Sequence, residues 1–141
     1  MAKELFAKKR RKVIPFDQTG QFYHRKAKKH MNNNNYLGAL NLYRKAIEKE
    51  PHNIDYLLDL AEVFTEMGCF DQSSKVLFTI LQKEKARVDC YFGLGCNFLG
   101  LQDYDRAIEC FEKYLDVDPY GIYSEEARDL LDVLEEYAYY T

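Results

Sequence analysis

The chain has 141 residues, a formal net charge of −3, and a composition that is 47% hydrophobic and 15% aromatic. Such a chain forms one compact domain or one short repeat array, needs neither disulfides nor a metal for its core, and is too apolar to be disordered. No apolar run approaches the about 20 residues of a membrane helix, and the N-terminus lacks the apolar stretch of a secretory signal, so we expect a cytoplasmic protein. With 3 Pro and 7 Gly, the composition favours helices over a turn-rich β-sandwich.

The N-terminal segment is strongly basic. Residues 1–30 hold 10 Lys and Arg against 2 acids, about +8, and the remaining residues carry about −11. We predict that residues 1–18 form a flexible or loosely docked tail with the run Lys8, Lys9, Arg10, Arg11 and Lys12. This run is interpreted as a solvated end, as an address or nucleic-acid contact whose affinity falls with salt, or as a segment that docks into an acidic groove. No aromatic residue interleaves with it, which argues against base-specific readout.

The rest of the chain repeats with a period of 34 residues. An offset of this length aligns two sets of small residues and one set of aromatic residues. These sets are Ala27, Ala61 and Gly95; Ala39, Ser73 and Ala107; and Tyr36, Phe70 and Tyr104. Apolar residues at helical spacing predict two antiparallel helices in each copy, which the small residues allow to approach closely. The predicted repeat region, residues 19–121, divides into copies 20–53, 54–87 and 88–121.

The third copy carries the clearest motif, which is Tyr91-x2-Leu94-Gly95-x2-Phe98, then Ala107-x3-Phe111, then Pro119. This pattern resembles the tetratricopeptide repeat (TPR). The second copy keeps Leu57-x2-Leu60-Ala61-x2-Phe64, whereas the first has the polar residues Lys26 and His30 at two of these positions. The resemblance covers about residues 20–121. It implies an all-α fold, an α-solenoid in which three helix-turn-helix repeats wind into a right-handed superhelix.

The turns and the end of the chain carry further signals. Asn34, Gly68 and Gln102 occupy equivalent turn positions, where a left-handed backbone suits Gly and Asn better than Gln. Residues 122–141 predict one more helix, which Ser124 can cap. Its apolar stripe is Ala127, Leu130, Leu131, Leu134 and Ala138. We interpret this helix as a cap on the last repeat, and the alternative is the first helix of a truncated fourth repeat.

The resemblance to TPR proteins also implies a concave groove lined by the first helix of each copy. Its residues form a basic wall, an acidic middle and an apolar far wall. They are Arg25 and Lys28; Asp55, Leu58, Asp59, Glu62 and Glu66; and Asp89, Phe92, Cys96 and Leu99. Some family members hold the C-terminal carboxylate of a chaperone in a clamp of Lys, Asn and Arg. The equivalent residues here are His24, Lys28, Asp59, Asp89 and Gly93, so two acids would repel a carboxylate and we expect no binding of that kind.

The acidic middle also follows from spacing alone. Asp55, Asp59, Glu62 and Glu66 fall within about 60° of the circumference of one helix, on the side away from its apolar stripe. They form either a solvated face or a site for a cationic segment, whose binding relieves their mutual repulsion. Phe92 and Leu99 are expected to lie exposed beside them and to suit an amphipathic partner. The alternative for both is contact with a neighbouring helix.

No catalytic or metal-binding set is present in the sequence. The 4 Cys and 3 His show neither a Cys-x-x-Cys pair nor zinc spacing, and there is no glycine-rich phosphate loop. We expect no enzyme activity, no metal and no cofactor, and cysteines that stay reduced as small hydrophobic residues.

The predicted function is a protein–protein interaction module or scaffold that binds a basic or amphipathic segment of a partner, as a peptide or helix, in the groove. The alternative is an adaptor whose basic tail contacts nucleic acid or an anionic surface while the repeats mediate assembly. Nucleic acid is the less favoured partner, and self-association through the tail or the terminal helix stays open.

Overall fold

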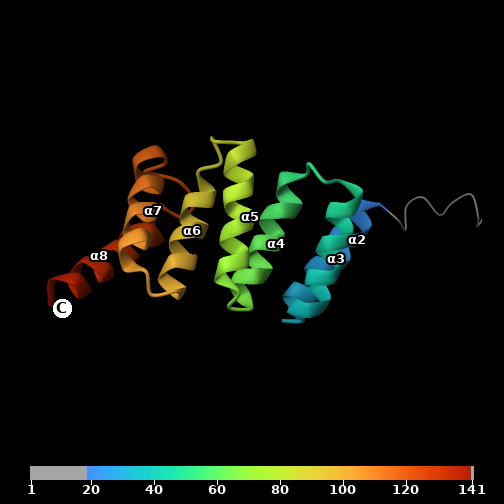
Figure 1. Ribbon diagram of the computed structural model, residues 1–141, viewed down its shortest axis with the longest axis horizontal. Coiled ribbons are helices and arrows are strands. Elements are labelled where there is room, and N and C mark those ends of the chain that lie inside the picture. Colours follow the sequence, from blue (N-terminus) through green and yellow to red (C-terminus); the bar gives the residue numbers. More distant parts are fainter. Residues whose placement is uncertain (1–18, 141) are drawn as a thin grey trace, which may run out of the picture. The chain divides into compact units, whose positions relative to one another are not determined.

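The computed structural model describes residues 19–140. Those residues form seven α-helices and no strand, as the sequence predicted (Figure 1). In chain order the helices are α2 (Gly20–Asn32), α3 (Tyr36–Lys49), α4 (Ile54–Glu66), α5 (Phe70–Lys83), α6 (Asp89–Gly100), α7 (Tyr104–Val117) and α8 (Ser124–Tyr140). None of these helices is both long enough and apolar enough to cross a membrane. The predicted basic tail, with Lys8, Lys9, Arg10, Arg11 and Lys12, lies outside the described residues.

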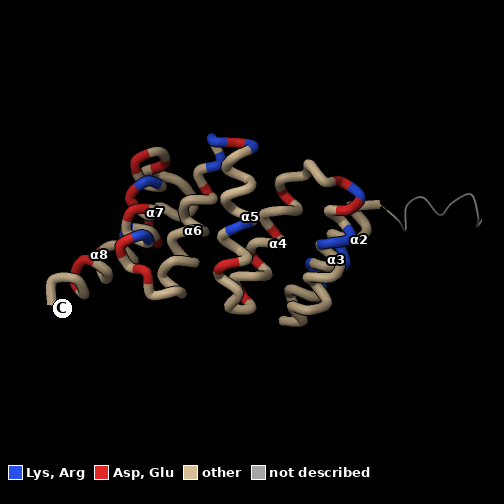
Figure 2. The backbone as a smooth tube through the Cα atoms, in the orientation of Figure 1, with Lys and Arg blue, Asp and Glu red and all other residues tan. Residues whose placement is uncertain are grey.

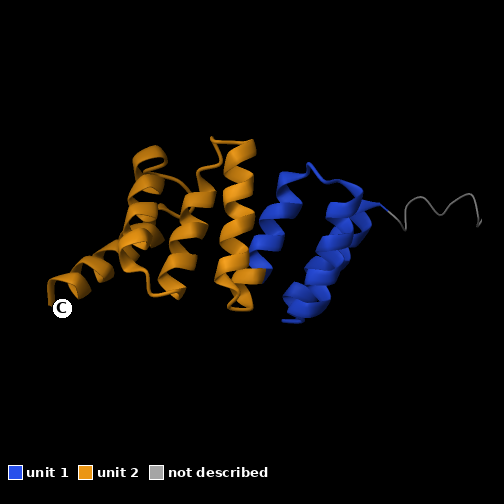
Figure 3. Ribbon diagram, viewed as in Figure 1, with its two compact units in different colours: residues 1–63 blue, residues 64–141 orange. Residues whose placement is uncertain are grey.

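The helices are grouped into two compact units, Met1–Val63 and Phe64–Thr141 (Figure 3). The boundary falls inside α4. Unit 1 therefore contains α2, α3 and most of α4, and unit 2 contains the last turn of α4 with helices α5 to α8. Each unit includes one complete helical hairpin of the predicted kind, which is α2/α3 in unit 1 and α6/α7 in unit 2.

In unit 1, α2 and α3 pack against each other along a line of small residues. Ala27 and Ala39, which the repeat pattern placed at the crossing, are both fully buried. The Thr19 side chain caps α2 and the Asn35 side chain caps α3, each accepting a hydrogen bond of 3.1 Å from a backbone N–H of the first turn. These caps satisfy N–H groups that have no partner within the helix, so both helix starts are fixed locally.

In unit 2, consecutive helices pack side by side from α5 to α8 (Figure 1). Gly95 of α6 lies over the ring of Phe111 on α7, and a Cβ atom added to Gly95 would stand 2.5 Å from a ring carbon. This close approach explains why the third copy has glycine where the others have alanine. The ring belongs to a buried cluster formed by Phe92, Ala107, Phe111, Tyr114, Ala127, Leu131 and Leu134.

The turns inside the three predicted copies share one backbone conformation. Asn34, Gly68 and Gln102 have φ angles of 58°, 77° and 61°, which confirms the predicted left-handed positions. In each turn the next residue donates its N–H to the carbonyl five residues earlier, at 2.8–2.9 Å. This hydrogen bond closes the preceding helix in the manner of a Schellman motif.

The terminal helix α8 follows the prediction in its core-facing residues and departs from it at both ends. Ala127, Leu131 and Leu134 are buried against the cluster of unit 2. Ser124 is the first residue of α8 rather than its cap, and its hydroxyl donates to the carbonyl of Asp118 at 2.7 Å. Ala138 is exposed, because the contacts of α8 with the cluster end before its last turns.

Candidate functional site

Three of the predicted groove acids lie on the part of α4 that belongs to unit 1. Asp55 and Glu62 are exposed, and Asp59 between them is half-buried. Nε2 of His24, on α2, pairs with Oδ2 of Asp59, and the two side chains are 19% and 22% exposed. Asp59 is therefore engaged within its own unit, and it is less available to a partner than the spacing suggested.

His24 is held in place by aromatic neighbours as well as by Asp59. Its ring stacks on Tyr56 with centroids 4.7 Å apart and an interplanar angle of 27°, and it lies 5.6 Å from the ring of Tyr43. The Tyr56 hydroxyl donates to Oε2 of Glu50 at 2.8 Å. The sequence placed His24 in the groove but gave no sign of these partners, which lie 19 to 35 residues further along the chain.

The carboxylates of α4 affect the tyrosines beneath them. Burial raises the pKa of Tyr43, and the negative charges of Asp59 and Glu62 raise it further. Burial raises the pKa of Tyr56 to about 12, with further contributions from its hydrogen bond to Glu50 and from the charge of Asp55. Burial is the largest cause of both shifts, and the nearby carboxylates add to it because their negative charge disfavours the phenolate.

The basic wall of the predicted groove is on α2. Arg25 and Lys28 are exposed, whereas Leu58 of α4 is half-buried. Figure 2 shows Lys and Arg on α2 and Asp and Glu on α4 within the same unit. Unit 1 therefore presents both signs of charge on the helices that the sequence assigned to the groove.

In unit 2, the prediction of an exposed Phe92 is wrong. Phe92 is 8% exposed, and its ring stacks on Tyr123 with centroids 4.5 Å apart and an interplanar angle of 4°. Phe111 and Tyr114 lie 5.6 and 5.8 Å from it. Tyr123 precedes α8 and lies beyond the last predicted copy, so the repeat pattern could not reveal the residue that covers Phe92.

The other predicted groove residues of unit 2 are partly covered. Leu99 and Cys96 are half-buried and pack against the aromatic cluster, and burial raises the pKa of the Cys96 thiol to about 11. Asp89 is half-buried and lies 3.4 Å from the guanidinium of Arg87. Glu66 is exposed. The apolar far wall expected from the sequence is thus largely part of the core.

A buried polar network joins α4, α5 and α6 in unit 2, and sequence reasoning missed it. The Asn97 side chain is fully buried, and its amide donates to the hydroxyls of Ser73 at 2.8 Å and Ser74 at 3.2 Å. The Thr65 hydroxyl donates to Oδ1 of Asn97 at 2.8 Å and lies 2.8 Å from the Ser73 hydroxyl. The repeat pattern assigned Ser73 only a role as a small residue.

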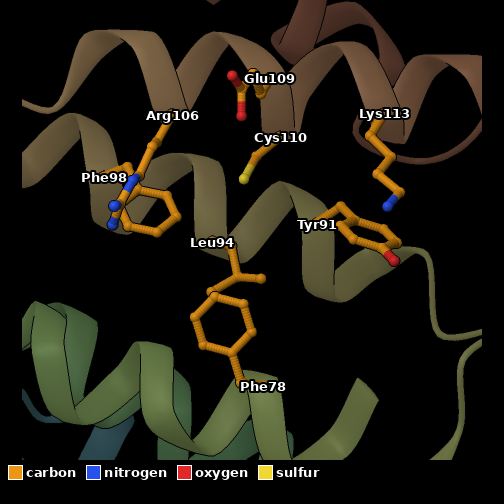
Figure 4. A pocket seen from close by; sticks show the side chains of 8 residues that line it. All are labelled: Phe78, Tyr91, Leu94, Phe98, Arg106, Glu109, Cys110 and Lys113. Atoms are coloured by element: carbon orange, nitrogen blue, oxygen red, sulfur yellow. The ribbon is translucent and has the colours of Figure 1, made fainter. Parts of the chain in front are cut away.

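A pocket of about 300 Å³ lies between α5, α6 and α7, and it is a second feature that the sequence did not predict (Figure 4). Phe78 of α5 and Leu94 of α6 form its apolar floor, and the Cys110 sulfur of α7 points into it. Burial raises the pKa of the Cys110 thiol to about 11, so this sulfur stays protonated at neutral pH. The remaining lining residues are Tyr91, Phe98, Arg106, Glu109 and Lys113.

Two cations border this pocket along α7. The guanidinium of Arg106 lies 5.6 Å from the centre of the Phe98 ring, and Nζ of Lys113 lies 4.8 Å from the centre of the Tyr91 ring. Neither the pocket nor any other part of residues 19–140 gathers three metal-ligating side chains.

Comparison with known proteins decides the family. Two sequence profiles described as tetratricopeptide repeat match residues 30–94 and 88–120. The chain belongs to the tetratricopeptide repeat family. The TPR-containing protein YvcD of Bacillus subtilis is 30% identical over 124 residues, an alignment that covers 87% of this chain and 26% of that protein. This TPR chain thus spans about a quarter of that relative.

Solved TPR structures confirm the all-α helical-repeat fold. The TPR domain of Arabidopsis OM64 superposes with a TM-score of 0.71 at 23% identity, covering 80% of this chain and 93% of that one. The first TPR of Spaghetti (RPAP3), bound to the HSP90 peptide SRMEEVD, superposes with a TM-score of 0.75 at 18% identity, covering 86% and 94%. At these identities the likeness establishes the solenoid class of fold, as the sequence predicted.

Proposed function

We propose that this TPR protein is a non-enzymatic interaction module, and that the acidic face of α4 in unit 1 binds a basic or amphipathic segment of a partner protein. The observation that carries the proposal is the pair of exposed carboxylates, Asp55 and Glu62, on either side of an Asp59 that His24 already holds. A bound cation reduces the repulsion between carboxylates on one helix face, and this reduction contributes to affinity.

The acids lie at regular spacing along one face of α4. Asp59 and His24 fix the face, because their contact joins α4 to α2. Asp55 and Glu62 lie one turn before and one turn after this contact. The two carboxylates are therefore about two turns apart, and a helical peptide that places Lys or Arg two turns apart can reach both of them.

The TPR neighbours suggest a contrasting ligand. Spaghetti (RPAP3) was solved with the acidic HSP90 peptide SRMEEVD, and yeast Sti1 TPR2B in a complex with pHsp70. In this chain His24, at a position of the family clamp, is paired with Asp59, whose negative charge would repel the carboxylate of a peptide. We therefore expect this TPR protein to discriminate against SRMEEVD.

The test compares three labelled peptides by fluorescence anisotropy with the full chain. They are a helical Lys/Leu peptide, its Glu/Leu counterpart and SRMEEVD. We expect saturable binding of the Lys/Leu peptide, weaker at high salt, and no saturable binding of the other two. The double variant Asp55→Lys with Glu62→Lys should bind the Lys/Leu peptide about tenfold or more weakly than the wild type does. Asp59 is left intact because reversing its charge would break the contact with His24.

A matched variant controls for net charge. Glu48→Lys with Glu135→Lys changes two exposed acids outside the proposed face and adds the same charge. This variant should bind the Lys/Leu peptide about as well as the wild type does. Equal losses in both variants, or binding of all three peptides alike, would overturn the proposal. A partner that is captured through the tail and is insensitive to both variants would favour the adaptor function instead.

A further inference from the structure

The pocket of unit 2 lies along a stripe of α7, and three residues of this stripe line it. Arg106, Cys110, Lys113 and Val117 are spaced at i, i+4, i+7 and i+11, so they lie within about 60° of one helix face and extend over about 16 Å. Cys110 points into the pocket between the two cations (Figure 4). Val117, at the end of the stripe, is 59% exposed. The stripe therefore alternates cationic and apolar positions.

The outer face of α8 carries the complementary pattern at the same spacing. Asp129, Val133, Glu136 and Tyr140 are also at i, i+4, i+7 and i+11. Val133 is 64% exposed and Tyr140 is 76% exposed, and both acids are exposed as well. Helix geometry places this stripe about 180° from the residues with which α8 packs on its own chain. The same helix can therefore contact its own unit on one side and another molecule on the other.

We propose that the terminal helix α8 of one copy of this chain docks lengthwise on α7 of a second copy, with Val133 entering the α5–α7 pocket. In a parallel register Asp129 meets Arg106, Glu136 meets Lys113, and Tyr140 meets Val117. In an antiparallel register that keeps two ion pairs, Asp129 meets Lys113 and Glu136 meets Arg106. This register sets Val133 against Glu109, whose charge disfavours an apolar neighbour. The spacing thus selects one orientation.

The charges support a second copy as the occupant. Helix α8 carries six acids and one arginine, and Figure 2 shows red segments along its visible part. The pocket rim contributes Arg106 and Lys113 against the single acid Glu109. Arg106 has a competing neighbour in Asp103, at 3.5 Å, but this ion pair is exposed and contributes little. Both cations also lie over aromatic rings, Arg106 over Phe98 and Lys113 over Tyr91, and such contacts leave them able to pair with the docked acids.

The proposed contact joins two different surfaces of the same chain, the outer face of α8 and the stripe of α7. Copies that dock in one direction only leave one α8 and one pocket unoccupied in every pair, so association continues with concentration, whereas copies that exchange their α8 helices close as a two-fold dimer. One helix in one shallow pocket buries less area than a stable dimer needs, and the association should be weak. It is independent of the acidic face of α4 and of the proposed function.

The test is sedimentation velocity of the full chain over a wide concentration range at low salt. The wild type should show a weight-average sedimentation coefficient that rises with concentration and falls when salt is added. Arg106→Glu with Lys113→Glu should weaken association by about tenfold or more, and so should Asp129→Lys with Glu136→Lys. Circular dichroism of each variant checks that the helices are retained.

Combining the four substitutions reverses both surfaces and should restore association, which no effect on folding alone would do. The control Lys83→Glu with Lys85→Glu changes exposed charges outside the pocket and should leave association unchanged. A wild type that stays monomeric at all concentrations overturns the proposal. Association that survives both charge-reversed pairs, or a fourfold variant that folds but does not associate, overturns it as well.

Discussion

The hairpins α2/α3 of unit 1 and α6/α7 of unit 2 occupy equivalent repeat positions but fill them differently. Where unit 2 has Leu94, 1% exposed, unit 1 has Lys26, whose ammonium lies over the ring of Phe22 at 4.8 Å. Where unit 2 has Phe98, unit 1 has His30, which lies 3.0 Å from the Asn35 amide. The polar residues of the first hairpin thus find solvent or local polar partners.

This difference shows which positions define the hairpin. Both hairpins keep a small residue at the helix crossing, Ala27 or Gly95, and both keep a left-handed turn residue, Asn34 or Gln102. The flanking positions are free to change from apolar to polar as long as the new side chain can reach water or a partner. Unit 2 therefore depends more on its apolar core than unit 1 does.

The largest expected effect is that of Phe111→Ala. The Phe111 ring is fully buried and packs against both Gly95 and Phe92. Its removal should therefore lower the free energy of unfolding by about 3–5 kcal/mol. Phe22→Ala removes a half-buried ring from unit 1 and should cost about 1 kcal/mol. Urea denaturation followed by circular dichroism measures both. Equal losses would contradict the contrast between the two hairpins.

The next effect concerns the buried polar network of unit 2. Asn97→Ala removes the amide that joins Ser73, Ser74 and Thr65, and it should cost about 1–3 kcal/mol of unfolding free energy. Asn41→Ala changes an exposed asparagine of α3 and should stay within about 0.5 kcal/mol of the wild type. A neutral Asn97→Ala would mean that the hydroxyls satisfy one another without the amide.

The crossing residue provides a smaller and more local test. Gly95→Ala sets a methyl group 2.5 Å from the Phe111 ring, and the resulting strain outweighs the gain in helix propensity, for a net loss of about 1–2 kcal/mol. The reciprocal change Ala27→Gly should cost about 1–2 kcal/mol, through helix propensity and the loss of a buried methyl group. Thermal unfolding of both variants decides whether the two hairpins are spaced differently. A stabilised Gly95→Ala variant would show that they are not.

The smallest effect is a difference in alkaline stability. In unit 2, burial raises the thiol pKa of Cys96 and Cys110 from 9.0 to about 11, so unfolding releases protons and stability declines as pH rises above about 9. In unit 1, burial raises the pKa of Tyr56 from 10.0 to about 12. The loss of stability that comes from Tyr56 therefore begins about one pH unit higher than the loss that comes from the two thiols. Urea denaturation between pH 8 and 11 measures the slope. In the double variant Cys96→Ser with Cys110→Ser, the free energy of unfolding should fall less steeply up to pH 10 than it does in the wild type.

The sequence predicted the fold closely because the fold is set by short-range signals. Helices, turns and small residues recur every 34 residues, and Asn34 and Gln102 mark turns even without glycine. The candidate site was predicted less well because its details depend on residues outside the period. Tyr123 covers Phe92 from beyond the last copy, and His24 meets Asp59 across 35 positions. The pocket requires three helices at once, which no single stretch of sequence encodes.

The network around Asn97 limits how this chain can be rearranged. Tandem repeats are often treated as interchangeable modules, so that copies can be exchanged, deleted or duplicated in protein engineering. Here the third copy carries an amide that needs the hydroxyls of the second, and the first copy has alanine where the second has Ser73. Transplanting the third copy beside the first would leave that amide without its acceptor, so adjacent copies should be moved together.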